Sequence, residues 1–133
     1  MSNAAVARND DELEKIRSIA SSGNDGPVLM LNLNRYVADA MYPHGELYRS
    51  YRRALDAVLP VVGAKIAWQS PAHGQIVGDQ PIDEILAVWY PSHQAFLDLP
   101  NAPGAENNYR LRAQCVEYAV IHRCDADQLK TMA

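Results

Sequence analysis

The sequence lacks the features that identify several large functional classes. No apolar run approaches the roughly 18 residues that a membrane-spanning helix needs, and the polar, acidic start does not resemble a signal peptide. No glycine-rich phosphate-binding loop is present. Lysine and arginine number 12 against 16 acidic residues, a net charge of −4, so there is no basic excess for nucleic acid. We therefore predict no membrane partner and no nucleic-acid partner.

Cysteine is scarce, and only Cys115 and Cys124 are present. On one strand they would lie about 30 Å apart at about 3.3 Å per residue, too far for a disulfide. Two unpaired thiols are typical of a reducing cytosol, so the protein is predicted to be cytoplasmic. The four histidines stand at no convincing ligand spacing with cysteine or carboxylate, so we predict no metal and no cofactor.

The chain has 133 residues, the length of one domain. Segments with the apolar spacing of a helix alternate with segments that have the apolar spacing of a strand. The first nine residues read as disordered, residues 10–124 as the domain, and residues 125–133 as a polar tail. Gln75–Val77 reads as a short extended piece between two turns. The predicted helices are residues 10 or 11 to about 22, 44–62, 92–99 and 105–112, and the predicted strands are residues 28–36, 64–70, 84–90 and 116–123.

Residues 28–36 (VLMLNLNRY) are the most informative segment, because their two faces differ. One face carries Leu29, Leu31 and Leu33, and the other carries Asn32 and Asn34 among apolar residues. We expect the leucine face to cover the chain's own helices, because a dry core would leave amides unpaired. The amide face would then border a half-wet cavity or a partner.

The order of elements predicts an α+β fold, a ferredoxin-like βαββαβ antiparallel sheet with an additional N-terminal helix. Helices cover only one face of such a sheet. The other face is expected to present an apolar surface that needs a cover, made of Met30, Ile66 or Ala67, Trp68 or Gln69, and Trp89. A second copy of the same sheet is the simplest cover, so we predict a homodimer.

Five motifs occur in this sequence in the same order as in a known family, and together they carry a resemblance to it. The sequence resembles the family called domain of unknown function 1330 (DUF1330), within the dimeric α/β barrel superfamily, over roughly residues 10–124. The resemblance implies two ferredoxin-like subunits whose sheets enclose a pocket. A histidine often found before the last strand is missing here, and Trp89 replaces a frequently acidic residue. The motifs are residues 27–36, Tyr48-x-x-Tyr51-x-x-Ala54, Gly63, residues 76–79 and residues 88–97.

Seven residues are candidates for a ligand pocket, and each also has an ordinary structural interpretation. Amides can orient a ligand carbonyl or bond the backbone. Aromatic rings can wall a flat ligand or anchor a dimer, and an arginine can hold a carboxylate or remain solvated. No catalytic residue is assigned. The candidates are Asn32, Asn34, Tyr48, Trp68, Trp89, Arg110 and His122.

Three functional hypotheses remain open at this point. The first is a cofactor-free enzyme, monooxygenase-like or isomerase-like, acting on a small molecule in a pocket between the sheet and the partner subunit. The second is a non-catalytic binding or sensor protein that uses the same pocket. The third is a structural dimer module without a pocket, which a cavity below about 300 Å³ would favour.

Overall fold

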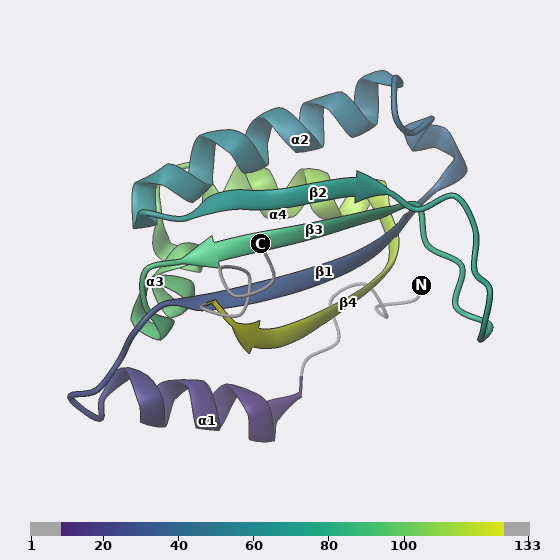
Figure 1. The fold of residues 1–133 in the computed structure, drawn as a ribbon. Helices are drawn as coiled ribbons and strands as arrows, with labels where there is room; N and C mark the ends of the chain where they lie inside the picture. The colour runs from purple at the N-terminus through teal and green to yellow at the C-terminus, as the bar shows by residue number, and fades with distance from the viewer. Residues whose placement is uncertain (1–8, 127–133) are drawn as a thin grey trace.

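The computed structural model describes residues 9–126, so the predicted disorder of residues 1–8 and the tail beyond residue 126 lie outside the described residues. The described chain forms four α-helices and one four-stranded sheet (Figure 1). No described helix is long and apolar enough to cross a membrane. The elements are α1 (Asp10–Ala20), β1 (Val28–Tyr36), α2 (Glu46–Val58), β2 (Lys65–Pro71), β3 (Glu84–Tyr90), α3 (His93–Asp98), α4 (Ala105–Cys115) and β4 (Val116–Asp125).

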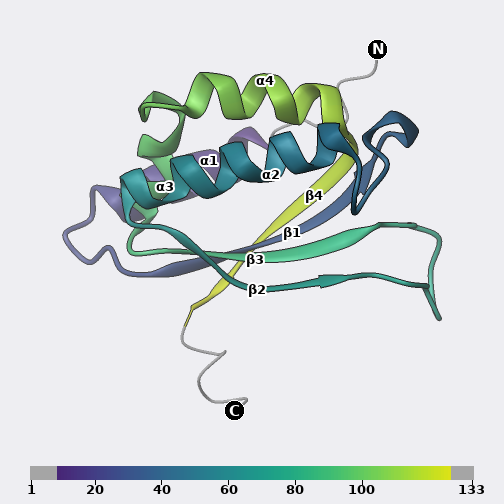
Figure 2. The ribbon, with the colours of Figure 1, turned by 90° about the horizontal axis from the view of Figure 1, so that it is seen from above.

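The sheet has the strand order β2-β3-β1-β4, and every neighbouring pair is antiparallel. With α2 between β1 and β2 and with α3 and α4 between β3 and β4, this is the predicted ferredoxin-like α+β fold. All four helices lie on one side of the sheet, as Figure 2 shows. The additional helix α1 lies along the β4 side of the sheet, whereas α2 and α4 pack against each other.

Most predicted elements are confirmed, with small shifts at their ends. The central strands β1 and β3 have the predicted bounds. The long predicted helix ends in a short 3-10 turn, Leu59–Val62, closed by Gly63 with a left-handed φ of 79°. Ser92 caps α3 as expected, since its Oγ accepts from the Ala95 amide at 3.0 Å. The expected extended piece at Gln75–Val77 is a series of bends, and Ile76 there is fully exposed.

The predicted orientation of β1 is wrong, because its amide face packs on the chain's own helices. Met30 and Tyr36 belong to the core that Tyr51, Leu55 and other helix residues form. The alternation of a strand separates two faces but does not say which one is covered. Bonded polar groups can lie in a core, and here Asn34 donates to the Tyr36 hydroxyl at 3.3 Å. The leucine face is therefore the outer one.

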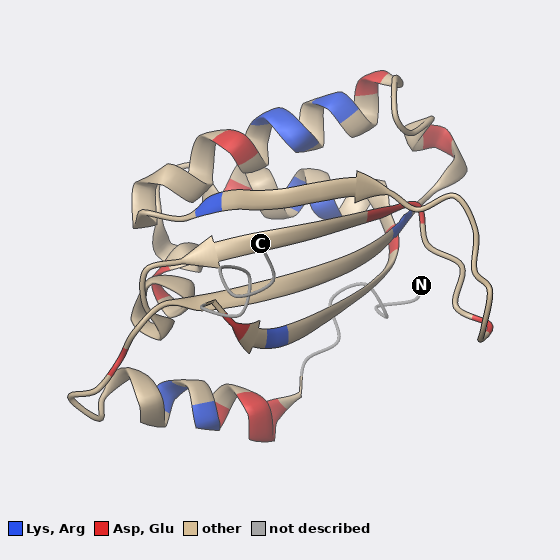
Figure 3. Ribbon diagram, in the orientation of Figure 1, with Lys and Arg blue, Asp and Glu red and all other residues tan. Residues whose placement is uncertain are grey.

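This outer face carries leucines, tryptophans and few charges. The register places Leu31 beside Ala87 and His122, and Leu33 beside Ile85 and Val120. Trp89 lies on the same face, and the Lys65 ammonium stands 5.5 Å from the centre of its ring. Figure 1 looks onto this face, and Figure 3 shows that charged residues lie mainly on helices and at strand ends. Trp68 on the edge strand is 50% exposed.

Candidate functional site

A cavity lies between the sheet and the chain's own helices. Its volume is about 640 Å³, within the usual range for a small-molecule site. The floor comes from the helix-facing residues of β1, β3 and β4, and the walls come from α1, α3 and α4 with two residues of α2. We call it the sheet–helix cavity. Its apolar lining includes Leu13, Ile16, Met30, Leu55, Leu86, Val88, Tyr90, Phe96, Leu97, Leu99, Ala119 and Ile121.

One wall of this cavity is polar. The α4 residues Asn108 and Arg112 line it, with Tyr51 of α2 next to Arg112, and Asn32 adds an amide to the floor. Asn108 and Arg112 stand four residues apart on α4, so they lie on the same side of the helix. The side chain of Asn108 is buried, and its Nδ2 has no hydrogen-bond partner among the described residues. A buried donor without a partner is costly and rare in native folds, so it points to a ligand or water.

The opening between α1 and β4 carries charged groups. Arg123 of β4 pairs with Glu12 of α1 through its Nε, and both line the cavity together with Arg17 of α1. The hydrogen bond from Arg123 holds the pKa of the Glu12 carboxyl below its ordinary value, although partial burial opposes this. The ion pair thus connects α1 to the edge strand and fixes one wall of the cavity.

A second polar cluster lies beyond the cavity, between α2 and the sheet. Glu84, the first residue of β3, is buried. The Tyr36 hydroxyl donates to its Oε1 at 2.6 Å, and the Tyr48 hydroxyl lies 2.9 Å from both carboxylate oxygens. Arg52 approaches Oε2 at 3.9 Å. Two hydroxyl donors and a nearby guanidinium satisfy this carboxylate, which explains how the fold tolerates it.

Burial keeps the tyrosines of this region protonated. It raises the pKa of Tyr36 and Tyr48 above the ordinary value, and the charge of Glu84 adds to the effect. Burial also raises the pKa of Tyr51 to about 12, while the Arg112 guanidinium acts in the opposite direction. At neutral pH these hydroxyls are therefore hydrogen-bond donors, and none is a base.

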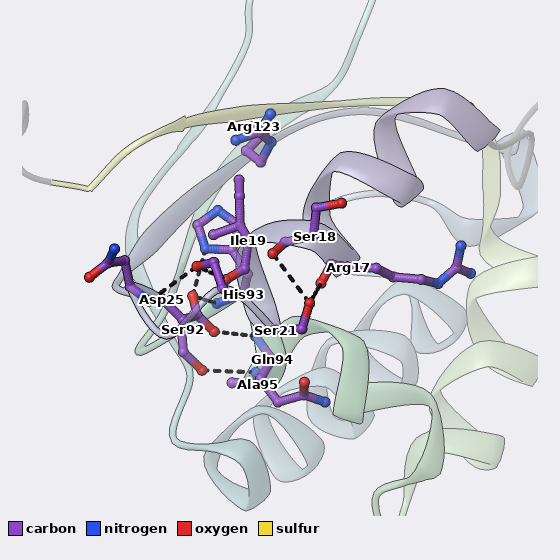
Figure 4. Close-up of polar contacts among 12 residues, drawn as sticks. Arg17, Ser18, Ile19, Ser21, Asp25, Ser92, His93, Gln94, Ala95 and Arg123 are labelled. Carbon is purple, nitrogen blue, oxygen red and sulfur yellow. Dashed lines mark hydrogen bonds and ion pairs between the residues drawn. The ribbon is translucent and has the colours of Figure 1, made fainter.

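Asp25 and His93 form a third polar group, at the start of α3 (Figure 4). The Asp25 carboxylate accepts from the amides of His93 and Gln94 at 2.8 and 3.0 Å, and the His93 Nδ1 lies 2.9 Å from Oδ1. His93, which a position just after the N-cap would leave solvated, is buried and only 7% exposed. Its partner stands 68 residues earlier, in the loop after α1. This contact fastens that loop to α3.

The seven predicted pocket residues do not come together. Only Asn32 lines the sheet–helix cavity, where its Nδ2 also donates to the Met30 carbonyl at 3.1 Å. Asn34 and Tyr48 are buried in the Glu84 cluster. Arg110 is exposed on α4 and bonds Asn107. The remaining three, Trp68, Trp89 and His122, lie on the outer face of the sheet.

Sequence reasoning missed the residues that define the polar wall, the buried carboxylate of Glu84 and the partly buried carboxylate of Asp25. Asn108 and Arg112 carry a usable signal, since a helix over residues 105–112 places positions four apart on one side. Glu84 gave no such signal, because it opens a strongly apolar strand. Asp25 stood in a turn-rich segment, and its contact with His93 is a long-range one. The order of elements alone does not reveal these pairings.

The described residues hold no group of three or more histidine, cysteine or acidic side chains arranged for a metal ion. Both cysteines are free thiols. Cys115 ends α4, so the two cysteines do not share a strand. Burial raises the pKa of Cys115 to about 12, with a contribution from Glu84. Such a thiol is not a nucleophile at neutral pH.

Two solved structures are similar to this chain. The RPA0582 protein of unknown function from Rhodopseudomonas palustris is 27% identical, with a TM-score of 0.73, and the match covers 92% of this chain and 97% of that one. Methylated RPA0582 is 26% identical with the same TM-score, and the match covers 93% and 96%. No family model and no curated protein matches. The α+β fold thus has a counterpart over nearly the whole chain, and the DUF1330 resemblance stays a prediction.

Proposed function

We propose that this chain is a small-molecule-binding protein whose ligand lies between the sheet and its own helices. The observation that carries the proposal is the sheet–helix cavity of about 640 Å³, apolar over most of its lining and polar at one wall. Sites of this kind bind compact apolar molecules and orient them through a few polar groups. The unpartnered amide of Asn108 supplies such a group.

Binding is favoured over catalysis by the state of the nearby carboxylates. Glu12 lines the cavity but is paired with Arg123. Glu84 is held by Tyr36 and Tyr48 and does not line the cavity. A monooxygenase-like or isomerase-like reaction would need a base within hydrogen-bond reach of the ligand. We therefore place the enzyme hypothesis second to a binding or sensor role.

The cavity volume also bears on the third hypothesis, a dimer module without a pocket. Trp68 and Trp89 do not fill the cavity, because they stand on the opposite face of the sheet. The cavity is about twice the roughly 300 Å³ at which small-molecule sites begin. We therefore give the structural role the lowest rank of the three.

We further propose that the outer sheet face is a homodimer interface. Several apolar residues are partly exposed there, and Trp68 is 50% exposed. The partly exposed residues are Leu31, Leu33, Ile85, Trp89 and Val120. Contiguous apolar surface with tryptophans is typical of interface cores. The second subunit that the DUF1330 resemblance implies would then pack on the leucine face. The ligand would lie on the other side of the sheet.

Binding is tested with two probes that share one fused-ring body, 8-anilinonaphthalene-1-sulfonate and neutral N-phenyl-1-naphthylamine. We expect saturable fluorescence enhancement by at least one of them, with one site per chain. Ile121→Trp narrows the cavity at an exposed position and should reduce binding at least tenfold. Val77→Trp, on an exposed loop outside the cavity, is the control and should bind normally. If Ile121→Trp weakened the binding of neither probe, the proposal would be overturned.

Dimerisation is tested by sedimentation velocity across a concentration series. The unaltered chain is expected at twice its monomer mass of 14.7 kDa. Trp68→Glu should give a folded monomer, because a charge in an apolar interface is strongly unfavourable. Val61→Glu changes a residue of similar exposure, 51%, on the helix side and should remain dimeric. A folded, unaltered chain that sediments as a monomer at all concentrations would refute the interface.

A further inference from the structure

The sheet–helix cavity is positively charged, although the chain as a whole is negatively charged. Three arginines line it, Arg17 from α1, Arg112 from α4 and Arg123 from β4. Glu12 is the only acidic side chain among the described lining residues. Three positive charges against one negative charge give the lining a net charge of +2, in a chain of net charge −4. Arg17 also pairs with Glu14 of the same helix at 3.4 Å, and Glu14 is outside the lining.

The positive groups come from three separate elements, so they are not one solvated helix face. Arg123 is held in place by Glu12, and its side chain is 29% exposed. Arg112 lies against Tyr51 at the polar wall, one helical turn after Asn108. A guanidinium has five N–H donors in a planar fork, which matches the oxygens of a carboxylate or sulfonate.

The lining also supplies neutral donors in the same place. The Asn108 side chain is 2% exposed and its Nδ2 is unpartnered among the described residues. Tyr51 remains protonated at neutral pH, because burial raises its pKa to about 12. An amide donor, a hydroxyl and a guanidinium together are matched by an acceptor that carries negative charge. A positive cavity with apolar walls also attracts such a ligand from solution.

Resting on the proposed binding function, we infer that the ligand of the sheet–helix cavity is an organic anion. It has an apolar or aromatic body and one carboxylate or sulfonate group. The body packs on the apolar lining, where Tyr90 of the floor and Phe96 of the α3 wall stand edge to face at 5.3 Å. The anionic group binds at the polar wall formed by Asn108 and Arg112. Arg17 and Arg123 add long-range attraction at the opening.

The two fluorescent probes test this inference separately from the proposed function, because they differ by one sulfonate group. The sulfonated probe should bind at least tenfold more tightly than neutral N-phenyl-1-naphthylamine, since hydrogen bonds to charged groups are the stronger class. Its affinity should also fall as salt is raised, because added ions screen charges near the surface. Affinity of the neutral probe should change little with salt.

Single substitutions locate the anionic group. Arg112→Gln should weaken the sulfonated probe about tenfold and the neutral probe less than threefold. Arg110→Gln, on the same helix but outside the cavity, is the matched control and should leave both affinities unchanged. Arg17→Gln removes an exposed positive charge at the opening and should weaken the sulfonated probe by a smaller factor. This substitution is not expected to affect folding.

The outcomes separate the two claims. Equal affinities for the two probes, both lost in Ile121→Trp, would overturn the anion inference and leave the binding function standing. Failure of both probes to bind would overturn the binding function itself. A sulfonated probe that binds tightly but is unaffected by Arg112→Gln and Arg17→Gln would show that these arginines do not select its charge, which also overturns the inference.

Discussion

The Tyr48 hydroxyl on α2 lies 2.9 Å from each carboxylate oxygen of Glu84 on β3. The two residues stand 36 positions apart in the sequence, so this contact joins a helix to the sheet. Tyr36 donates to the same carboxylate from β1. The carboxylate therefore holds three elements together, at the end of the sheet next to the polar wall of the cavity.

Removing one of these hydroxyls should cost stability. Tyr48→Phe keeps the ring but leaves Glu84 with fewer donors, so we expect a loss of about 1–3 kcal/mol in the free energy of unfolding. Urea denaturation followed by circular dichroism measures it. Ser50→Ala on the same helix removes only exposed bonds, to Glu46 and from Arg53, and should change stability by less than about 0.5 kcal/mol. Equal effects of the two substitutions would contradict this role for Glu84.

Asp25 should make stability depend on acidic pH. Its burial raises the pKa, but the amides of His93 and Gln94 and the His93 ring outweigh this, so the pKa lies below its ordinary value. A carboxyl with a depressed folded pKa stabilises the fold above its unfolded pKa, about 3.9, and this contribution disappears as pH falls through the folded pKa. Asp25→Asn should therefore be less stable than the unaltered chain at pH 7, with the difference shrinking below about pH 4.

Urea midpoints at pH 7, 5, 4 and 3 test the Asp25 prediction. Asp79→Asn, in the exposed loop between β2 and β3, is the control and should show no comparable difference at any pH. If the Asp25→Asn difference stayed constant from pH 7 to pH 3, its carboxylate would not be the group that anchors α3.

The two thiols should differ sharply in reactivity. Cys115 has no exposed surface, and burial raises its pKa to about 12, so almost no thiolate is available at pH 8. Cys124 is partly exposed on β4. Iodoacetamide should therefore modify Cys124 first and Cys115 only in urea, as peptide mass spectrometry will show. In Cys124→Ser the native protein should stay unmodified; rapid native modification of Cys115 would contradict its burial.

Local patterns sufficed for the elements and their order. Alternating apolar residues in β1 and the helical stripe around Tyr51 and Leu55 predict their own secondary structure, and βαββαβ order then restricts the topology. The orientation of β1 was not predictable in this way. It depends on whether Asn34 finds a partner in the core, and that partner, the Tyr36 hydroxyl, in turn donates to Glu84 on another strand.

The site was less predictable than the fold, for the same reason. Asn32 was singled out from its place on a strand and does line the cavity. The prediction placed it against a partner subunit, however, because the wrong face was taken as covered. Asn108 and Arg112 form the polar wall because α4 places them across from β1. That placement follows only from how α4 packs on the sheet. Packing between residues far apart in the sequence decides which polar residues meet, and local sequence patterns carry no information about that packing.

Asn108 offers a direct test of whether the polar wall is kept for a ligand at a cost in stability. Its buried Nδ2 lacks a partner among the described residues, so replacement by an apolar side chain of similar size removes an unfavourable group. Asn108→Leu should raise the free energy of unfolding by about 1 kcal/mol while weakening the sulfonated probe about tenfold. Urea denaturation and fluorescence titration on the same sample measure both. Asn107→Leu, exposed one residue earlier, should change neither. A protein that is destabilised by Asn108→Leu and still binds normally would show that this amide serves the fold and not the ligand.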